Sequence, residues 1–213
     1  MMKLKVLNLY AGIGGNRKLW KDVEVTAVEN NPQIAKIYQD FFPDDKVIVA
    51  DAHQYLLDHY KEFDFIWSSP PCQTHSVCNN FLNAQGKIRY PDIKLYEEII
   101  FLQHFAKCKW VIENVKSYYE PLIKPQKADR HYFWSNFHIS NFKLMRYFNI
   151  INARHSTRLK NQVHNKELQK FHNLDLSSYK GIDKYNVLNN CVNPKVGLHI
   201  FKCAFKIKQQ TLE

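Results

Sequence analysis

Five short apolar runs recur in the first 115 residues, and longer segments with helical character separate them. The runs predict strands at residues 5–10, 23–29, 46–50, 63–68 and 109–115. The segments between them predict helices at residues 16–21, 32–41, 53–60 and 92–107. Strands that alternate with helices indicate a parallel sheet with crossover helices, which is a doubly wound α/β fold.

The pattern changes after about residue 120. The stretch HYFWSNFHI (131–139) predicts an aromatic-rich strand or hairpin. Residues 140–187 are polar and weakly periodic, and they carry nine Lys or Arg against three acidic residues. The C-terminal segment fits an amphipathic helix only in part, through Val196, Ile200, Cys203 and Phe205.

Charge and cysteine usage narrow the class of protein. The net charge of +10 favours a polyanionic partner, with nucleic acid first, although compositional bias also produces Lys-rich chains. The chain contains no run of about 18 apolar residues, and its N-terminus runs into a glycine turn without a cleavage site. We therefore expect an intracellular protein without a membrane span. Five scattered cysteines with no CxxC pair predict neither a disulfide framework nor a metal site.

A glycine-rich turn follows the first predicted strand. Gly12, Gly14 and Gly15 would let the backbone turn sharply and approach a ligand closely. The predicted helix after the turn would offer its N-terminus to an anionic group. An ordinary strand-to-helix turn would have the same composition.

Two carboxylates close the next two predicted strands. Glu29 ends the second strand, where it could accept hydrogen bonds from both hydroxyls of a ribose, and Asp51 ends the third. The carboxyl ends of adjacent parallel strands face one crevice. These residues therefore predict a site for a nucleoside cofactor, either a dinucleotide or S-adenosylmethionine.

Cys72 follows the fourth predicted strand and should face the same crevice. Two prolines precede it, and they fix the backbone and remove two donors. A buried structural thiol and a nucleophile both fit this position. Glu113 and Asn114 end the fifth strand, so Glu113 should point towards Cys72. A nucleophile beside a carboxyl group suggests covalent attack assisted by a general acid.

Six motifs resemble those of the DNA cytosine-5 methyltransferase (Dcm-like) family, and three of them, the glycine turn, PCQ and ENV, stand in this order at predicted strand ends. They are LYAGIGG (9–15), ENNPQIAKIYQDFFP (29–43), PCQ (71–73), DIKLYEEIIFL (92–102), ENV (113–115) and NCVNP (190–194). The resemblance spans residues 5–139 and 187–205, and PCQ together with ENV is its most specific part. The short basic region makes the chain similar to compact phage-type members.

The resemblance implies a Rossmann-like, S-adenosylmethionine-dependent methyltransferase sheet with a small basic recognition subdomain. Residues 1–139 and 187–213 would form the catalytic, cofactor-binding domain, and residues 140–186 the recognition region. Glu29 would bind the ribose and Asp51 the adenine. The full set of implied cofactor-binding residues is Tyr10, Ala11, Gly12, Ile13, Gly14, Gly15, Glu29, Asn30, Asp51, Ala52, Pro70, Asn190 and Val192.

The resemblance also implies a mechanism. Cys72 would attack C6 of cytosine while Glu113 binds and protonates N3, and C5 of the resulting enamine would take the methyl group. Loss of the C5 proton and of Cys72 would restore the ring. The base must be flipped out, because C6 is unreachable inside a stacked duplex.

The sequence departs from the family pattern in several places. The Gln-x-Arg-x-Arg motif is represented by Gln126 and Arg130, with Ala128 in place of the first arginine. We expect Arg130 to fix the flipped base and support Glu113. Ser68-Ser69 stands where glycines are frequent, and His75 where an aromatic residue is common.

The expected partner is double-stranded DNA, bound by a monomer or weak dimer in the cytoplasm of a bacterial or phage-infected cell. The net +6 of the 140–187 region suits phosphate contacts. The predicted nucleic-acid contacts are Gln73, Ser76, Arg146, Arg154, Arg158 and Lys160.

Two alternatives stay open. The tRNA-directed branch of the family shares PCQ and ENV, so an RNA cytosine-5 methyltransferase fits the same residues. A catalytically degenerate relative that only binds nucleic acid is the other alternative. The joint presence of Cys72, Glu113 and the glycine turn argues against it.

Overall fold

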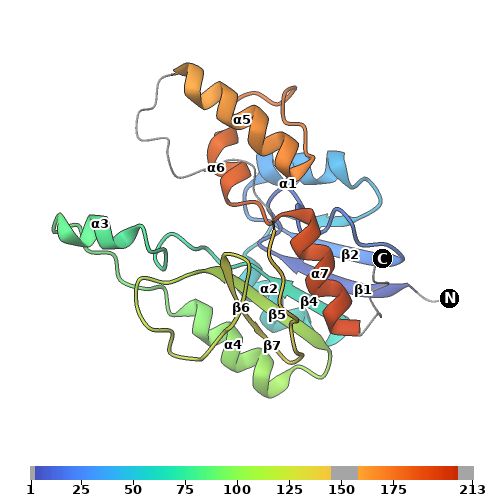
Figure 1. The fold of residues 1–213 in the computed structure, drawn as a ribbon. Helices are drawn as coiled ribbons and strands as arrows, with labels where there is room; N and C mark the ends of the chain where they lie inside the picture. Colours follow the sequence, from blue (N-terminus) through green and yellow to red (C-terminus); the bar gives the residue numbers. More distant parts are fainter. Residues whose placement is uncertain (1–2, 145–157, 206–213) are drawn as a thin grey trace, which may run out of the picture.

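A computed structural model describes residues 3–144 and 158–205, with backbone only for 158–163. It contains a seven-stranded mixed sheet of order β3-β2-β1-β4-β5-β7-β6 (Figure 1). The strands are β1 (Leu4–Leu9), β2 (Val23–Val28), β3 (Lys46–Ile48), β4 (Phe65–Ser68), β5 (Lys109–Val115), β6 (Gln126–Ala128) and β7 (His131–Ser135). The helices are α1 (Pro32–Phe41), α2 (Ala52–His59), α3 (Asn79–Ala84), α4 (Lys94–Phe105), α5 (Arg158–His172), α6 (Lys184–Asn189) and α7 (Pro194–Phe205), with a 3₁₀ turn η1 (Tyr60–Glu62).

The five parallel strands confirm the predicted doubly wound sheet. β1 lies at its centre and pairs in parallel with β2 and β4, so that Leu7 is opposite Thr26 and Ile66. β4 is buried at every position because helices cover both faces of the sheet there, whereas β2 has an exposed glutamate at position 24. Their carboxyl ends meet at one edge, as the positions of Glu29 and Cys72 require.

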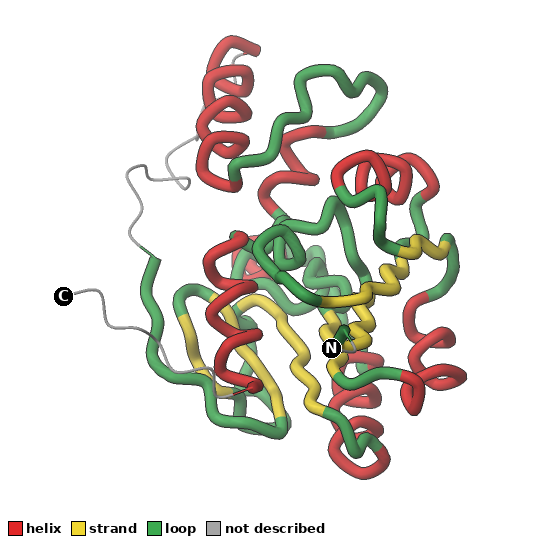
Figure 2. Tube along the Cα trace, turned by 90° about the vertical axis from the view of Figure 1, so that its right-hand side faces the viewer, coloured by secondary structure: helices red, strands yellow, loops and turns green. Residues whose placement is uncertain are grey.

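Alternate residues of each strand pack into different cores. On one face, Trp67 and Phe133 pack with Ile200 and Phe201 of α7. On the other face, Ile66 belongs to the core that α2 and α4 cover. Figures 1 and 2 show α7 lying across one side of the sheet, which makes the C-terminal segment part of the main core. The α7 helix, expected only in part from the sequence, is therefore a complete helix.

The predicted helix at 16–21 is wrong. Residues 11–19 form successive tight turns, in which the N–H of Arg17 donates to the Gly14 carbonyl, three residues back. The Asn16 side chain turns inward and donates to the buried Asn8 side chain at 2.7 Å. The N–H groups of Lys18 and Trp20 also donate three residues back, so the segment lacks the four-residue spacing of an α-helix. The helix N-terminus that was expected to hold an anion is therefore absent.

The aromatic stretch forms a strand, β7, as the sequence predicted, and β7 makes a hairpin with β6, which precedes the stretch. β7 pairs antiparallel with both β5 and β6, so the sheet is mixed rather than wholly parallel. Three helices were not predicted, namely α3, α5 and α6. Each has too few apolar residues for a clear helical period, since α3 and α6 have six residues each and α5 is strongly polar.

The basic region packs against the glycine turn. Leu168 of α5 and Leu188 of α6 share a small core with Ile13 and with Ile37 of α1. The Nζ of Lys18 also donates to the carbonyl of Asn173. The described part of this region is thus joined to the cofactor-facing turn by apolar packing, and its separation as a recognition unit stays a prediction.

Candidate active site

Asn114 fixes the segment that carries Cys72. Its Nδ2 donates to the carbonyl of Pro70 at 3.0 Å, and its Oδ1 accepts from the N–H of Val115 at 2.9 Å. Both Asn114 and Pro70 are buried. The carbonyl of Cys72 then accepts from the N–H groups of His75 and Ser76, which closes a tight turn. The thiol therefore stands on a backbone held from both sides.

Replacing Asn114 by aspartate should loosen this segment, because it removes the donor to Pro70 and buries a charge. We expect a loss of about 2 kcal/mol in the free energy of unfolding and a fall of about 10- to 100-fold in the rate of methyl transfer. Asn136→Asp is a matched control, since Asn136 makes the same kind of double contact with Cys108 and Trp110 away from the site. Equal losses of rate in both variants would contradict the positioning role.

Burial sets the protonation of the two central side chains. Desolvation, and then the charge of Glu113, raises the pKa of Cys72 to about 11. Desolvation raises the pKa of Glu113 to about 7, while Ser69 and Arg130 act in the opposite direction. Burial therefore favours the thiol form of Cys72 and the protonated form of Glu113. The structure brings together the three residues predicted to be catalytic, Cys72, Glu113 and Arg130.

The two serines that depart from the family pattern each serve a buried carboxylate. Ser69 accepts from Trp67 Nε1 at 2.8 Å, and its side chain hydrogen-bonds Glu113. Ser68 Oγ donates to Glu98 Oε2 at 2.6 Å. These contacts explain why polar residues stand in this otherwise apolar strand end.

Arg130 lies between the catalytic and the C-terminal motifs. Its charge favours the ionised forms of both Cys72 and Glu113. Its Nη2 donates to the carbonyl of Asn189 at 3.3 Å. Arg130 therefore occupies the place expected for a residue that supports Glu113, whereas contact with a flipped base stays a prediction.

The strand-end carboxylates Glu29 and Asp51 both accept hydrogen bonds from backbone N–H groups, and their contact with a cofactor stays a prediction. Glu29 accepts from the N–H of Gly12 at 3.0 Å and from the N–H of Asn31 at 2.9 Å, which ties the glycine turn to the end of β2. Asp51 caps α2 by accepting from the N–H of Gln54 at 2.9 Å and is exposed. Asn30 is exposed beside Glu29, and Ala52 is buried in the first turn of α2.

The glycine turn leaves room for a cofactor and packs against the last motif. A Cβ on Gly12 would meet no atom within 4 Å, so its backbone borders open space. A Cβ on Gly15 would lie 2.2 Å from Cys191 Sγ and 2.3 Å from the Val192 carbonyl. Val192 is buried against this turn, whereas Asn190 is exposed. The open backbone and the two acidic side chains fit a nucleoside cofactor bound along the strand ends.

Sequence reasoning missed Glu98, a fully buried carboxylate on α4. It accepts from Tyr10 Oη at 2.6 Å and from Ser68, and His53 Nδ1 lies 3.2 Å away. It thereby fixes the predicted cofactor residue Tyr10. A glutamate among the apolar positions of helix 92–107 was the available signal. This signal was ambiguous because Glu97 stands next to Glu98 in the sequence and is exposed, so the sequence does not show which of the two is buried.

The contact with Glu98 raises the pKa of His53. A histidine whose folded pKa is raised stabilises the fold below its unfolded pKa of about 6.5, and this contribution is lost as pH rises through the folded pKa. We expect His53→Gln to lower the free energy of unfolding by about 1 kcal/mol at pH 6 and by less at pH 9, as measured by urea denaturation. His59→Gln, in an exposed pair with Glu62, controls for loss of a histidine. If His53→Gln lowers the free energy of unfolding by the same amount at pH 6 and pH 9, His53 does not stabilise the fold through its charge.

The loop after Cys72 is anchored at its start. His75 is buried and its Nδ1 lies 2.6 Å from Tyr119 Oη, and the N–H of Tyr118 donates to the His75 carbonyl. Ser76 is half-buried, and its backbone forms a bridge with Ser117. His75 therefore replaces the common aromatic residue as an anchor of the loop.

The predicted nucleic-acid contacts are only partly described. Gln73 is exposed beside Cys72, with its carbonyl engaged by Asn79. Arg146 and Arg154 lie outside the described residues. Arg158 and Lys160 lie in the first turn of α5, where only the backbone is described. Contacts by all these residues stay predictions.

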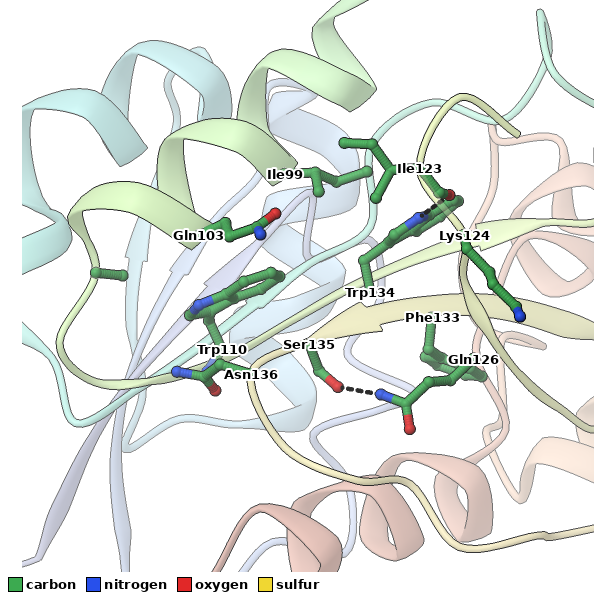
Figure 3. Close-up of a pocket in the computed structure, with 11 residues that line it drawn as sticks. Ile99, Gln103, Trp110, Ile123, Lys124, Gln126, Phe133, Trp134, Ser135 and Asn136 are labelled. Atoms are coloured by element: carbon green, nitrogen blue, oxygen red, sulfur yellow. Dashed lines mark hydrogen bonds between the residues drawn. The ribbon is translucent and has the colours of Figure 1, made fainter.

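A separate pocket lies between α4, β5 and the β6–β7 hairpin (Figure 3). Figure 3 shows Trp134 donating to Ile123 and Gln126 donating to Ser135 at its wall. Lys124 is its one ionisable lining residue, and none of the predicted catalytic or cofactor-binding residues lines it. We therefore assign the chemistry to the strand-end crevice.

The described residues contain no group of three or more His, Cys, Asp or Glu placed to hold a metal ion. In the same part of the chain, no helix is both long and apolar enough to span a membrane.

The doubly wound sheet, the open glycine turn and the strand-end carboxylates define a Rossmann-like protein with a site for a nucleoside cofactor. The family model for "C-5 cytosine-specific DNA methylase" matches residues 4–156. The chain therefore belongs to the C-5 cytosine-specific DNA methylase family, as the motifs predicted.

Relatives and solved structures agree with this assignment. A tRNA (cytosine(38)-C(5))-methyltransferase from Spodoptera frugiperda is 32% identical over 138 residues, which cover 61% of this chain and 40% of that protein. The chain thus matches less than half the length of this curated relative.

Two solved structures share the fold, each with a TM-score of 0.60. The Entamoeba histolytica methyltransferase EhMeth is 14% identical and is matched over 97% of this chain and 99% of its own. A mutant of Spodoptera frugiperda DNMT2 is 16% identical and is matched over 95% of this chain and 100% of its own. At these identities the similarity shows the fold alone.

Proposed function

We propose that the chain is a DNA (cytosine-5-)-methyltransferase that acts through a covalent bond between Cys72 and C6 of a flipped cytosine. The observation that carries the proposal is the arrangement at the ends of β4 and β5, where a clamped thiol lies beside a buried glutamate whose pKa is raised by its burial. The description of the matched family supports DNA as the substrate.

The side chains divide the work as follows. Cys72 Sγ adds to C6, and Glu113 donates its proton to N3, so the ring accepts the electron pair without building up a full negative charge. Glu29 and Asp51 hold the ribose and adenine ends of the cofactor. S-adenosylmethionine supplies the electrophilic methyl group that C5 receives. Arg130 holds the base and offsets the charge left on Glu113.

Cys72 has to lose its thiol proton when the substrate binds. A pKa of about 11 leaves Cys72 protonated in the free protein. The thiol proton passes to solvent water before the S–C6 bond forms, and Arg130 favours that ionisation. Enclosure of the flipped base by the loop after Cys72 would then exclude water from the formation of that bond.

A tRNA substrate is the second candidate, favoured by the similarity to the tRNA (cytosine(38)-C(5))-methyltransferase. We propose a competition assay with labelled S-adenosylmethionine, in which equimolar duplex DNA and unmodified tRNA are offered together. Label in DNA that is mapped to 5-methylcytosine by bisulfite sequencing supports the DNA proposal. Label in tRNA alone would mean that the substrate is RNA and the mechanism is unchanged. If neither nucleic acid is labelled although the cofactor binds, the enzymatic proposal is contradicted.

A cytoplasmic role in modifying the DNA of a bacterial or phage-infected cell fits this activity. Bisulfite sequencing of DNA from cells that express the chain reports activity and sequence context together. An unmodified genome beside a methylated tRNA pool would exclude that role.

A further inference from the structure

A second ionisable side chain lies against Glu113. His131 Nε2 is 3.5 Å from Glu113 Oε1, and each side chain is only 9% exposed. In the antiparallel β5–β7 register, Glu113 is opposite Phe133 and Val115 is opposite His131. His131 and Phe133 are two residues apart on one strand, so both face the side of the sheet that holds Glu113.

His131 lies beside the position where the family motif has an arginine that this chain lacks. His131 is the direct cross-strand partner of Ala128, the residue that stands where the family motif has its first arginine. The ring of His131 packs edge-on against Phe133 with centroids 6.3 Å apart, which limits its orientations. An imidazole is therefore held next to the position where the family motif has a permanent cation.

We propose that His131 is a positioning residue that acts through Glu113, supplying the positive charge that the arginine at position 128 would otherwise provide. The inference rests on the proposed role of Glu113 as the proton donor to N3. When that proton moves to N3, a carboxylate is left in a buried site. An imidazolium 3.5 Å away stabilises this carboxylate and so favours protonation of the base.

Other charged groups around Glu113 do not replace this effect. Arg130 is a permanent cation and cannot produce a pH dependence near neutrality, and Cys72 titrates near pH 11. Ser69 is a hydrogen-bonding partner without charge. The contact between His131 and Glu113 is therefore the one that the following substitutions test.

The first test measures kcat/KM for methyl transfer against pH in the wild type and in His131→Gln. Without the charge of His131, the maximum value of kcat/KM should fall about 10-fold. The pH at which kcat/KM declines on the alkaline side should rise by about one unit, because Glu113 then keeps its proton to higher pH. His131→Arg should restore the maximum. His172→Gln, which changes a buried histidine of α5 outside the assigned site, should leave the limb in place. An unmoved limb in His131→Gln would overturn the proposal.

The second test needs no activity and so separates this proposal from the proposed function. Titration of the His131 ring by nuclear magnetic resonance in the wild type and in Glu113→Gln should show its pKa fall by about one unit or more when the carboxylate is removed. An unchanged titration overturns the pairing even in an active enzyme. An inactive wild type with a coupled His131 contradicts only the proposed function.

Discussion

Replacement of Cys72 by serine is expected to reduce methyl transfer about 10⁴-fold or more, while cofactor binding is retained. A serine hydroxyl is a much weaker nucleophile than a thiolate towards C6. The substitution changes one atom in a half-buried position, so the fold should be kept. The rate is measured with labelled S-adenosylmethionine on cytosine-containing duplex DNA and, in parallel, on tRNA.

Cys78→Ser is the matched control for this variant. Cys78 is exposed and lies six residues further along the same loop, so its loss tests the effect of removing a nearby thiol. It should leave the rate within about twofold of the wild type. If Cys72→Ser keeps a comparable rate, Cys72 is not the nucleophile.

Replacement of Glu113 by glutamine should lower the rate about 10²- to 10⁴-fold, because an amide can hold N3 but cannot donate the proton. The carboxyl has a pKa of about 7, above its unfolded value, so ionisation between pH 4.5 and 7 costs native stability. Glu113→Gln should therefore be more stable than the wild type at pH 8 and equally stable near pH 4. Thermal unfolding at the two pH values measures this difference.

Glu120→Gln is the control, since Glu120 is an exposed glutamate seven residues beyond Glu113. It should change neither the rate nor the pH dependence of unfolding. A Glu113→Gln variant that loses activity but gains no stability at pH 8 would show that Glu113 is not held neutral by burial. A variant that keeps full activity would exclude the role as proton donor.

The sheet could be predicted because its strands are buried on both faces. Apolar runs such as residues 63–68 have no polar alternation, and glycines or strand-end carboxylates mark their ends. The segment 16–21 does not form the predicted helix because its buried tryptophan packs elsewhere. Trp20 is buried and donates to the carbonyl of Gly197, so it anchors a turn to α7 instead of a helix to the sheet.

The proximity of Cys72 and Glu113 could be predicted from the strand order, because the carboxyl ends of parallel strands meet at one edge of the sheet. Cys72 and Glu113 were placed together for that reason, and Asn114 was found beside them without a role. His131 could not be placed, because its contact with Glu113 depends on an antiparallel register set by a hairpin. Glu98 was missed because its partners come from three separate strand and helix ends.

The central claim is that Cys72 forms a covalent bond with C6 of cytosine. It is tested most directly by incubating the protein and S-adenosylmethionine with DNA and RNA that contain 5-fluorocytosine, which cannot lose its C5 substituent as a proton. Mass spectrometry of the trapped complex should show one nucleotide adduct on the peptide that contains Cys72. The absence of an adduct on both nucleic acids, or its location on Cys78, would contradict the account.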